Sequence, residues 1–130
     1  MPPDTTGAIL LVDDFDDGRE LYAEYLSFRG FQVRTAASGA EAIKSIQGEC
    51  PSLVLMDIGM RDMTGTEVLK WLRENHVCDG VPIVALTAFA LEAETTQALA
   101  DGFDAVIPKP CLPDDLATFI TSILSKPTRT

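Results

Sequence analysis

The stretch ILLVDD at Ile9–Asp14 joins a short, uninterrupted apolar segment to two acidic residues. Two further segments have the same uninterrupted apolar character, Leu53–Met56 and Pro82–Leu86. Strands without polar alternation are typical of a parallel sheet that is covered by helices on both faces. We therefore expect three buried parallel strands, the first of them over Ala8–Val12.

Two other segments are suited to the edges of such a sheet. Phe31–Thr35 alternates apolar and polar residues, which is typical of a strand with one face in water. Ala105–Pro108 is short, and its proline lacks the backbone N–H that a central strand needs. With right-handed crossovers, the strand order 2-1-3-4-5 satisfies these requirements. The expected fold is α/β and flavodoxin-like, a (βα)5 doubly wound parallel sheet of five strands.

Apolar residues at helical spacing fill the chain between and after these strands. The expected helices lie around Leu21–Leu26, Ser38–Ile46, Gly65–Leu72, Leu91–Ala100 and Leu116–Ile123. Ser38 followed by Glu41 predicts a capping box at the start of the second helix. Asp16 and Asp17 are suited to cap and charge the positive end of the first helix.

Length and composition restrict the function. The 130 residues suffice for one domain, expected over residues 8–125 between terminal tails at 1–7 and 126–130. Acidic residues outnumber basic ones 20 to 10, which disfavours binding to nucleic acid or to an anionic membrane. No apolar run reaches the ~18 residues of a membrane span, and Met1–Gly7 lacks the features of a signal peptide. The expected location is the cytoplasm.

The cysteines and the histidine suggest no chemistry of their own. Cys50, Cys78 and Cys111 are far apart and odd in number, so we expect neither a disulfide framework nor a zinc site. This cysteine usage fits a reducing cytosol. His76 is the only histidine, which excludes chemistry that needs two histidines from this chain.

Polar residues follow four of the five expected strands. They are Asp13 and Asp14 after the first strand, Asp57 after the third, Thr87 after the fourth and Lys109 after the fifth. In a parallel sheet of this order, ligands bind beyond the carboxyl ends of the strands, near the point where the order reverses. We therefore expect these side chains to form one site.

The charges of this site predict its chemistry. Three carboxylates and one ammonium carry a sum of −2, and like charges this close repel one another unless a cation compensates. One Mg²⁺ would bring the sum to zero, and carboxylate oxygens suit this ion. An aspartate beside Mg²⁺ and a lysine can attack phosphorus and form an aspartyl-phosphate, because both cations stabilise the charge on the phosphoryl oxygens.

Four segments in order carry a resemblance to a known family. They are ILLVDD at Ile9–Asp14, LVLMDIGMRDMTG at Leu53–Gly65, IVALTA at Ile83–Ala88, and Lys109-Pro110. Over roughly Ala8 to Leu124 the chain resembles the receiver domain of two-component response regulators. The resemblance implies a phosphoacceptor domain that acts as a signalling switch and not as a turnover enzyme.

The resemblance also implies a role for each site residue. Asp57 resembles the phosphoacceptor, and Asp14 the direct Mg²⁺ ligand. Asp13 would act on the ion mainly through water, and the main-chain carbonyl of Gly59 would be a further ligand. Thr87 matches the switch hydroxyl.

The remaining positions of the pattern are matched only in part. Lys109 matches the lysine that contacts the phosphoryl group, and Pro110 completes a Lys-Pro step that is often cis in the family. Val106 stands where the family usually has the Tyr or Phe of the switch, so Thr–aromatic coupling is not expected here. Arg61 stands where many receivers have a proline.

Partners follow from the same resemblance. A sensor histidine kinase or a histidine phosphotransfer protein would supply the phosphoryl group and dock on the first helix, near Asp16, Arg19 and Glu20. The surface of the fourth helix, fifth strand and fifth helix, including Leu91–Asp101 and Ala105–Pro108, would control a downstream protein. We expect a monomer or weak homodimer, either a stand-alone regulator or a receiver module of a larger regulator or hybrid kinase.

Three alternatives stay open. Asp13–Glu24 nearly fits a calcium-binding loop, although Phe15 occupies a ligand position. Asp14 followed by Asp16 resembles the nucleophile motif of haloacid-dehalogenase-type phosphatases, which would make the chain a small Mg²⁺-dependent enzyme. A pseudo-receiver would keep the fold as a binding module without phosphorylation. The phosphatase and receiver hypotheses place the nucleophile at Asp14 or at Asp57, so an Asn substitution at each position separates them.

Overall fold

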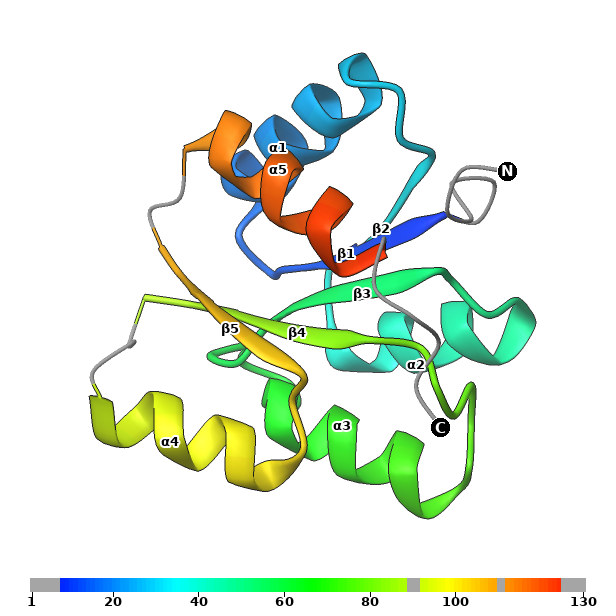
Figure 1. The fold of residues 1–130 in the computed structure, drawn as a ribbon. Helices are drawn as coiled ribbons and strands as arrows, with labels where there is room; N and C mark the ends of the chain where they lie inside the picture. The colour runs from blue at the N-terminus through cyan, green and yellow to red at the C-terminus, as the bar shows by residue number, and fades with distance from the viewer. Residues whose placement is uncertain (1–7, 89–91, 110–111, 125–130) are drawn as a thin grey trace.

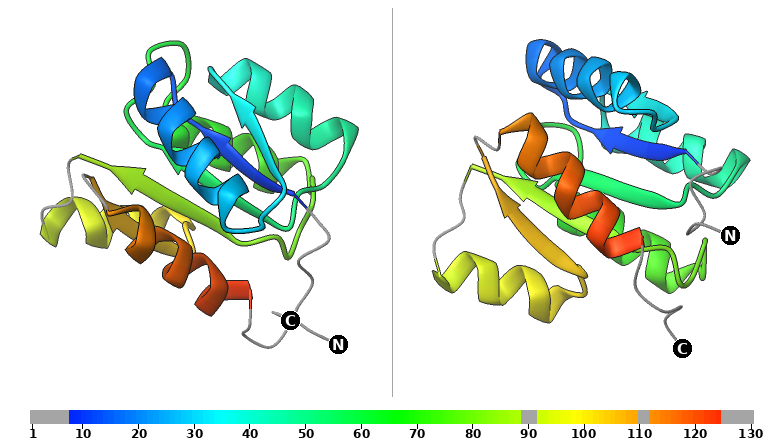
Figure 2. Two further views of the ribbon diagram at one scale, coloured as in Figure 1. Left: turned by 90° about the horizontal axis from the view of Figure 1, so that it is seen from above. Right: turned by 45° about the horizontal axis from the view of Figure 1, so that its top comes forward.

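The computed structural model describes residues 8–88, 92–109 and 112–124, and these contain a five-stranded parallel sheet (Figure 1). The strands are β1 (Ile9–Val12), β2 (Val33–Ala36), β3 (Leu53–Asp57), β4 (Ile83–Thr87) and β5 (Ala105–Pro108). Their order is β2-β1-β3-β4-β5, and every neighbouring pair is parallel, which confirms the predicted topology. All strands therefore end at one edge of the sheet (Figure 2).

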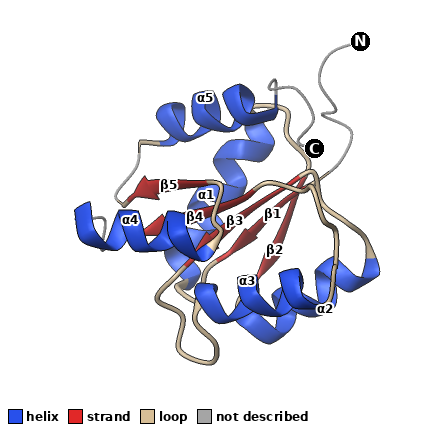
Figure 3. Ribbon diagram, turned by 60° about the horizontal axis from the view of Figure 1, so that its bottom comes forward, coloured by secondary structure: helices blue, strands red, loops and turns tan. Residues whose placement is uncertain are grey.

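A helix follows each strand along the chain. The helices are α1 (Asp16–Phe28), α2 (Gly39–Gly48), α3 (Gly65–Glu74), α4 (Glu92–Asp101) and α5 (Pro113–Leu124). Helices α1 and α5 cover one face of the sheet, and α2, α3 and α4 cover the other (Figures 1 and 3). Among the described residues, no helix combines the length and the apolar character needed to cross a bilayer.

The sheet is buried on both faces, which explains the uninterrupted apolar strands. In β1, Ile9 and Leu11 pack toward α1 and α5, while Leu10 and Val12 pack toward α2, α3 and α4. All four side chains are at most 1% exposed. Burial of each large aliphatic side chain contributes about 1.5–3 kcal/mol to folding, so the three central strands hold both helical layers in place.

The two edge strands behave as predicted, with one shift in position. The second strand was expected from Phe31 but begins at Val33, because the N–H of Phe31 donates to the carbonyl of Leu26 and completes the end of α1. Gly30, with φ at +97°, makes the turn that allows this ending. Pro108 lies in β5, which pairs only with β4, so its missing N–H interrupts no second ladder.

The helix starts differ from the expected caps. At α2, Ser38 accepts a hydrogen bond from the N–H of Glu41 at 3.1 Å, but the Glu41 carboxylate accepts from Ala37 and not from Ser38. The reciprocal capping box lies instead at α3, where Thr64 and Glu67 each accept from the other's N–H. Asp16 and Asp17 do not cap α1, because Phe15 is its N-cap residue; they lie in its first turn, where their charge favours the helix dipole.

The absence of a disulfide was a wrong prediction, and the cysteine usage therefore does not support a reducing compartment. Cys50, which follows α2, is bonded to Cys78 in the loop between α3 and β4, and the two Cα atoms lie 5.7 Å apart. The cysteines are 28 positions apart in the sequence, which hides this proximity. They come together because both loops lie at the amino ends of the neighbouring strands β3 and β4. Cys111 lies outside the described residues.

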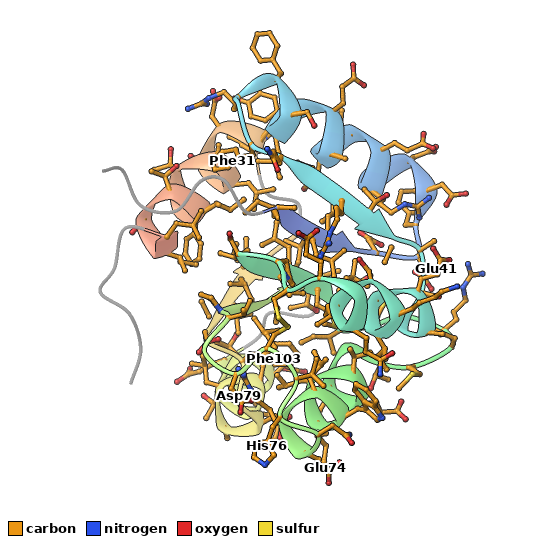
Figure 4. All side chains as sticks on the ribbon, turned by 90° about the vertical axis from the view of Figure 1, so that its right-hand side faces the viewer. Phe31, Glu41, Glu74, His76, Asp79 and Phe103 are labelled. Atoms are coloured by element: carbon orange, nitrogen blue, oxygen red, sulfur yellow. A yellow bond between two sulfur atoms is a disulfide. The ribbon has the colours of Figure 1, made fainter. Side chains whose placement is uncertain are left out.

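The loop before β4 also contains His76, as expected. Its ring pairs with the Asp79 carboxylate at 3.1 Å, and the two side chains lie together on the exposed end of this loop (Figure 4). The loop lies at the amino end of β4, whereas the predicted site lies at the carboxyl ends of the strands. His76 therefore takes no part in that site.

Candidate functional site

The structure brings the predicted acidic residues together. Asp13 and Asp14 directly follow β1, and Asp57 is the last residue of the neighbouring strand β3. Each of the three offers a carboxylate oxygen, and these oxygens all lie within 4.8 Å of one another. The switch in strand order therefore produces one acidic cluster from two segments that are far apart in sequence.

Asp13 is the most tightly held of the three carboxylates. Its side chain is buried, and its Oδ1 accepts a hydrogen bond from the N–H of Phe15 at 2.9 Å. Its Oδ2 accepts from Lys109 Nζ at 2.7 Å. The guanidinium of Arg19 donates to the Asp13 main-chain carbonyl at 2.9 Å. Because its carboxylate is buried and is held by short hydrogen bonds on both oxygens, Asp13 is suited to act on a metal through water.

Lys109 connects the ends of three strands. Its Nζ lies 2.7 Å from Asp13 Oδ2 and 3.5 Å from Asp57 Oδ2, while its backbone N–H donates to the carbonyl of Thr87 at 2.8 Å. Burial alone would lower the pKa of Lys109, but the hydrogen bond to Asp13 and the charges of both aspartates raise it above its ordinary value. Lys109 therefore stays protonated and compensates part of the acidic charge.

Asp57 is a carboxylate in a poorly solvated position. Its side chain is 15% exposed, and its Oδ1 accepts a hydrogen bond from the N–H of Gly59 at 3.0 Å. Burial raises the pKa of Asp57 above its ordinary value, and the Asp13 charge adds to this, while Gly59 and Lys109 act in the opposite direction. An aspartate of raised basicity beside an ammonium group is suited to act as a nucleophile.

Gly65 has a role at the site that we did not predict from the sequence, where it was only a helix start. A Cβ atom at Gly65 would lie 2.7 Å from the main-chain oxygen of Asp57 and 2.9 Å from the Cα of Ile58. The N–H of Gly65 donates to the carbonyl of Ile58 at 2.9 Å. Only a residue without a side chain lets α3 begin this close to the acidic strand end.

Asp14 has a cationic neighbour that was also missed. Its Oδ2 accepts two hydrogen bonds from Arg61, one from the backbone N–H at 3.0 Å and one from Nε at 3.2 Å. The side chain of Asp14 is 20% exposed and that of Arg61 is 87% exposed. The signal in the sequence was Arg61 itself, which stands four residues after Asp57 at a position where many receivers have a proline.

Asp62 anchors the loop that follows Asp57. Its carboxylate accepts from the N–H of Gly39 at 3.0 Å and from that of Ala40 at 3.1 Å, both at the start of α2. These hydrogen bonds, with Gly39 as the largest contribution, hold the pKa of Asp62 below its ordinary value. These hydrogen bonds therefore fix the loop to α2, although position 61 holds an arginine where many receivers have a proline.

The donor set fits a hard divalent cation. Carboxylate oxygens, with room for water ligands, are what Mg²⁺ prefers in proteins. Asp14 and Asp57 are the better direct ligands, because their side chains are 20% and 15% exposed, whereas that of Asp13 is buried. The structure shows the N–H of Gly59 beside Asp57; the part played by its carbonyl stays a prediction.

Two alternatives lose support from this geometry. The calcium-loop hypothesis for Asp13–Glu24 is wrong, because most of that stretch forms α1. The phosphatase-like hypothesis needs Asp16 as an acid or base beside Asp14, but the Asp16 carboxylate forms an ion pair with Arg19 at 2.7 Å.

The remaining predicted positions are distributed as follows. Thr87 ends β4 and is 3% exposed, one residue beyond the partner of Asp57 in the sheet. Val106 lies in β5 and packs against the core beneath α2, α3 and α4. Pro110 and Leu91 lie outside the described residues.

Known proteins share this sequence pattern. A family profile described as "Response regulator receiver domain" matches residues 9–121. The chain is 36% identical over 119 residues to the transcriptional regulatory protein GltR of Pseudomonas aeruginosa, covering 92% of this chain and 49% of GltR. It is 30% identical over 105 residues to the polar-differentiation response regulator DivK of Brucella ovis, covering 81% of this chain and 85% of DivK. The chain thus spans about half the length of GltR and most of DivK.

Solved structures share the fold. A putative response regulator from Chloroflexus aurantiacus superimposes with a TM-score of 0.85 at 28% identity, covering 97% of this chain and 100% of the other. A CheY-like receiver domain protein from Methanospirillum hungatei gives a TM-score of 0.82 at 33% identity, with coverages of 91% and 93%. The chemotaxis protein CheY4 of Vibrio cholerae gives 0.84 at 28% identity, with coverages of 90% and 98%.

Proposed function

The chain belongs to the response regulator receiver domain family, and from this premise we propose that it accepts a phosphoryl group on Asp57 from a partner's phosphohistidine in an Mg²⁺-dependent reaction. One observation carries the proposal: the ammonium of Lys109 lies between Asp13 and Asp57, within an acidic cluster whose oxygens lie within 4.8 Å of one another. This arrangement would supply a nucleophile, a cation and metal ligands at one edge of the sheet.

The transfer step uses the chain's own residues in defined roles. A carboxylate oxygen of Asp57 attacks phosphorus, so that an O–P bond forms while the P–N bond to the donor imidazole breaks. The electron pair of that bond returns to the imidazole nitrogen, which takes a proton from water. Lys109, whose Nζ lies 3.5 Å from Asp57 Oδ2, would hold the phosphoryl oxygens as their charge develops. Thr87, buried at the end of β4, would donate its hydroxyl to one of them.

Mg²⁺ would be held by Asp14 and Asp57 directly, by Asp13 through water, and by the main-chain carbonyl of Gly59. When bound, the ion would neutralise charge on the phosphoryl oxygens. Contacts within the protein would orient two of these side chains, because Asp13 accepts hydrogen bonds from Phe15 and Lys109, and Asp57 accepts one from Gly59.

Phosphorylation would alter the surface formed by α4, β5 and α5. The new group adds negative charge beside Lys109 and Thr87, whose backbones are joined by a 2.8 Å hydrogen bond between β4 and β5. A shift of either residue would therefore move β5. Val106 has no aromatic ring that could couple to Thr87, so it would transmit the movement through its packing against the core. Backbone chemical shifts test this with beryllofluoride and Mg²⁺: resonances of α4 and β5 should move, and shifts confined to the ends of β1 and β3 would contradict it.

The donor would dock beside the site through apolar contacts. Phe15, directly after Asp14, is 62% exposed, and Leu112, directly before α5, is 70% exposed. On α1, Leu21 is 59% exposed. Large exposed apolar side chains near a reactive residue favour a helical protein partner over a small charged substrate. We place the reaction in the cytoplasm, in a stand-alone regulator or in the receiver module of a larger one.

Intact mass after incubation with phosphoramidate and Mg²⁺ tests the proposed function. Wild type should gain one phosphoryl group, and both EDTA and Asp57→Asn should abolish the gain. Asp57→Asn is a conservative change that keeps the side-chain shape, so loss of the adduct reports on the nucleophile. If Asp57→Asn still gains the group and Asp14→Asn does not, the phosphatase-like assignment replaces ours. If wild type forms no adduct and beryllofluoride does not bind, the chain is a pseudo-receiver.

A further inference from the structure

Arg61 adds a second cation to the acidic cluster. The site then contains the carboxylates of Asp13, Asp14 and Asp57 and the cations Lys109 and Arg61. The charges leave a sum of −1, whereas the three carboxylates with Lys109 alone leave −2. A site of lower negative charge attracts a divalent cation less strongly.

The contact falls on one carboxylate oxygen. Arg61 donates both its backbone N–H and its Nε–H to Oδ2 of Asp14, the residue that we propose as the direct Mg²⁺ ligand. The backbone hydrogen bond can orient Asp14 whatever side chain stands at position 61. The Nε contact adds the positive charge, and it can break without disturbing the fold because the Arg61 side chain is 87% exposed.

We propose that the guanidinium of Arg61 competes with Mg²⁺ for Asp14 and thereby weakens metal binding by the unphosphorylated protein. The inference rests on the metal site of the proposed function and adds a residue that tunes it. Binding of the ion to Asp14 breaks the Arg61–Asp14 ion pair and brings Mg²⁺ close to the guanidinium, which is also positively charged. The side chain then turns toward solvent, while the backbone N–H of Arg61 continues to orient Asp14.

Calorimetric titration with MgCl₂ measures the effect directly. Arg61→Ala should bind Mg²⁺ about two- to fivefold more tightly than wild type, the range in which exposed ion pairs contribute. Arg61→Lys should stay near wild type, because an ammonium keeps the charge beside Asp14. Lys70→Ala is the matched control, since it removes the same charge from an exposed position on α3 and should leave the affinity unchanged. Raising the salt to about 1 M should shrink the difference between wild type and Arg61→Ala.

A second measurement is independent of affinity. The Nε–H resonance of Arg61 should move when wild type is titrated with Mg²⁺, because the contact with Asp14 breaks. Equal or weaker Mg²⁺ binding by Arg61→Ala, with wild type still binding, would overturn the inference and leave the metal site standing. Equal tightening by Lys70→Ala would also overturn it, because net charge would then explain the result. If neither wild type nor Arg61→Ala binds Mg²⁺, the proposed metal site itself fails, and this inference with it.

Discussion

At the scale of single residues, the environment of Asp57 favours reactivity at the expense of stability. Burial, supported by the Asp13 charge, raises the pKa of Asp57 in the folded protein. An acid with a raised folded-state pKa destabilises the fold at pH values above its ordinary value of about 3.9. Asp57→Asn should therefore increase the free energy of unfolding at pH 7, and the gain should vanish below about pH 3.9, where Asp57 is protonated in both states. Urea unfolding at the two pH values measures this; a less stable variant at pH 7 would contradict it.

The ionised carboxylate of Asp62 stabilises the fold, whereas that of Asp57 destabilises it. Its hydrogen bonds from Gly39 and Ala40 lower its pKa, so its ionised form stabilises the fold above the ordinary value of about 3.9. This stability is lost as the pH falls through the lowered folded-state pKa. At pH 7, Asp62→Ala should cost about 0.5–1 kcal/mol, the lower part of the range for helix caps because the carboxylate is exposed. The difference should shrink in acid, whereas the control Glu24→Ala, which removes an exposed carboxylate from the middle of α1, should show no such pH dependence. A cost that is constant from pH 7 into acid would rule out the ionised carboxylate as its source.

At the scale of elements, the Cys50–Cys78 disulfide links the end of α2 to the loop before β4. A cross-link that closes a loop of this size contributes typically about 2–4 kcal/mol, largely by restricting the unfolded chain. Reduction should lower the free energy of unfolding by that amount, and Cys50→Ser should make the protein insensitive to dithiothreitol. Free-thiol titration of the unfolded protein checks the bond. Three reactive thiols without reductant, one for each of Cys50, Cys78 and Cys111, would contradict it.

The strands and the site could be predicted from the sequence, and the loop contacts could not. Short uninterrupted apolar runs such as Leu53–Met56 are typical of strands in a sheet covered on both faces, and parallel strands bring their carboxyl ends to one edge. Asp14 and Asp57 could therefore be assigned to one site before the structure was known. The contacts of Cys50, Asp62 and Arg61 join loops from different parts of the chain. Such contacts have no periodicity, so the three-dimensional path of each loop decides them.

At the scale of the whole molecule, the donor and the output should use different surfaces. Leu112 is 70% exposed beside the site, and Leu99 is 49% exposed on α4. If the donor docks beside the site, Leu112→Ser should slow phosphoryl transfer from a phosphorylated histidine phosphotransfer protein about tenfold, as loss of an interface anchor does. Leu99→Ser makes the same chemical change on the proposed output surface and should leave the transfer rate unchanged. Phosphorylation by phosphoramidate requires no protein docking, so Leu112→Ser should leave its rate unchanged. An equal loss of rate with phosphoramidate and with the protein donor would contradict the docking surface.

The identity of the phosphorylated residue tests the central claim most directly. After incubation with phosphoramidate and Mg²⁺, borohydride reduces an aspartyl-phosphate to homoserine, and peptide mass spectrometry locates the change. We predict homoserine at position 57 in wild type, and none when EDTA is present. Homoserine at position 14, or at position 57 without any requirement for Mg²⁺, would contradict the account.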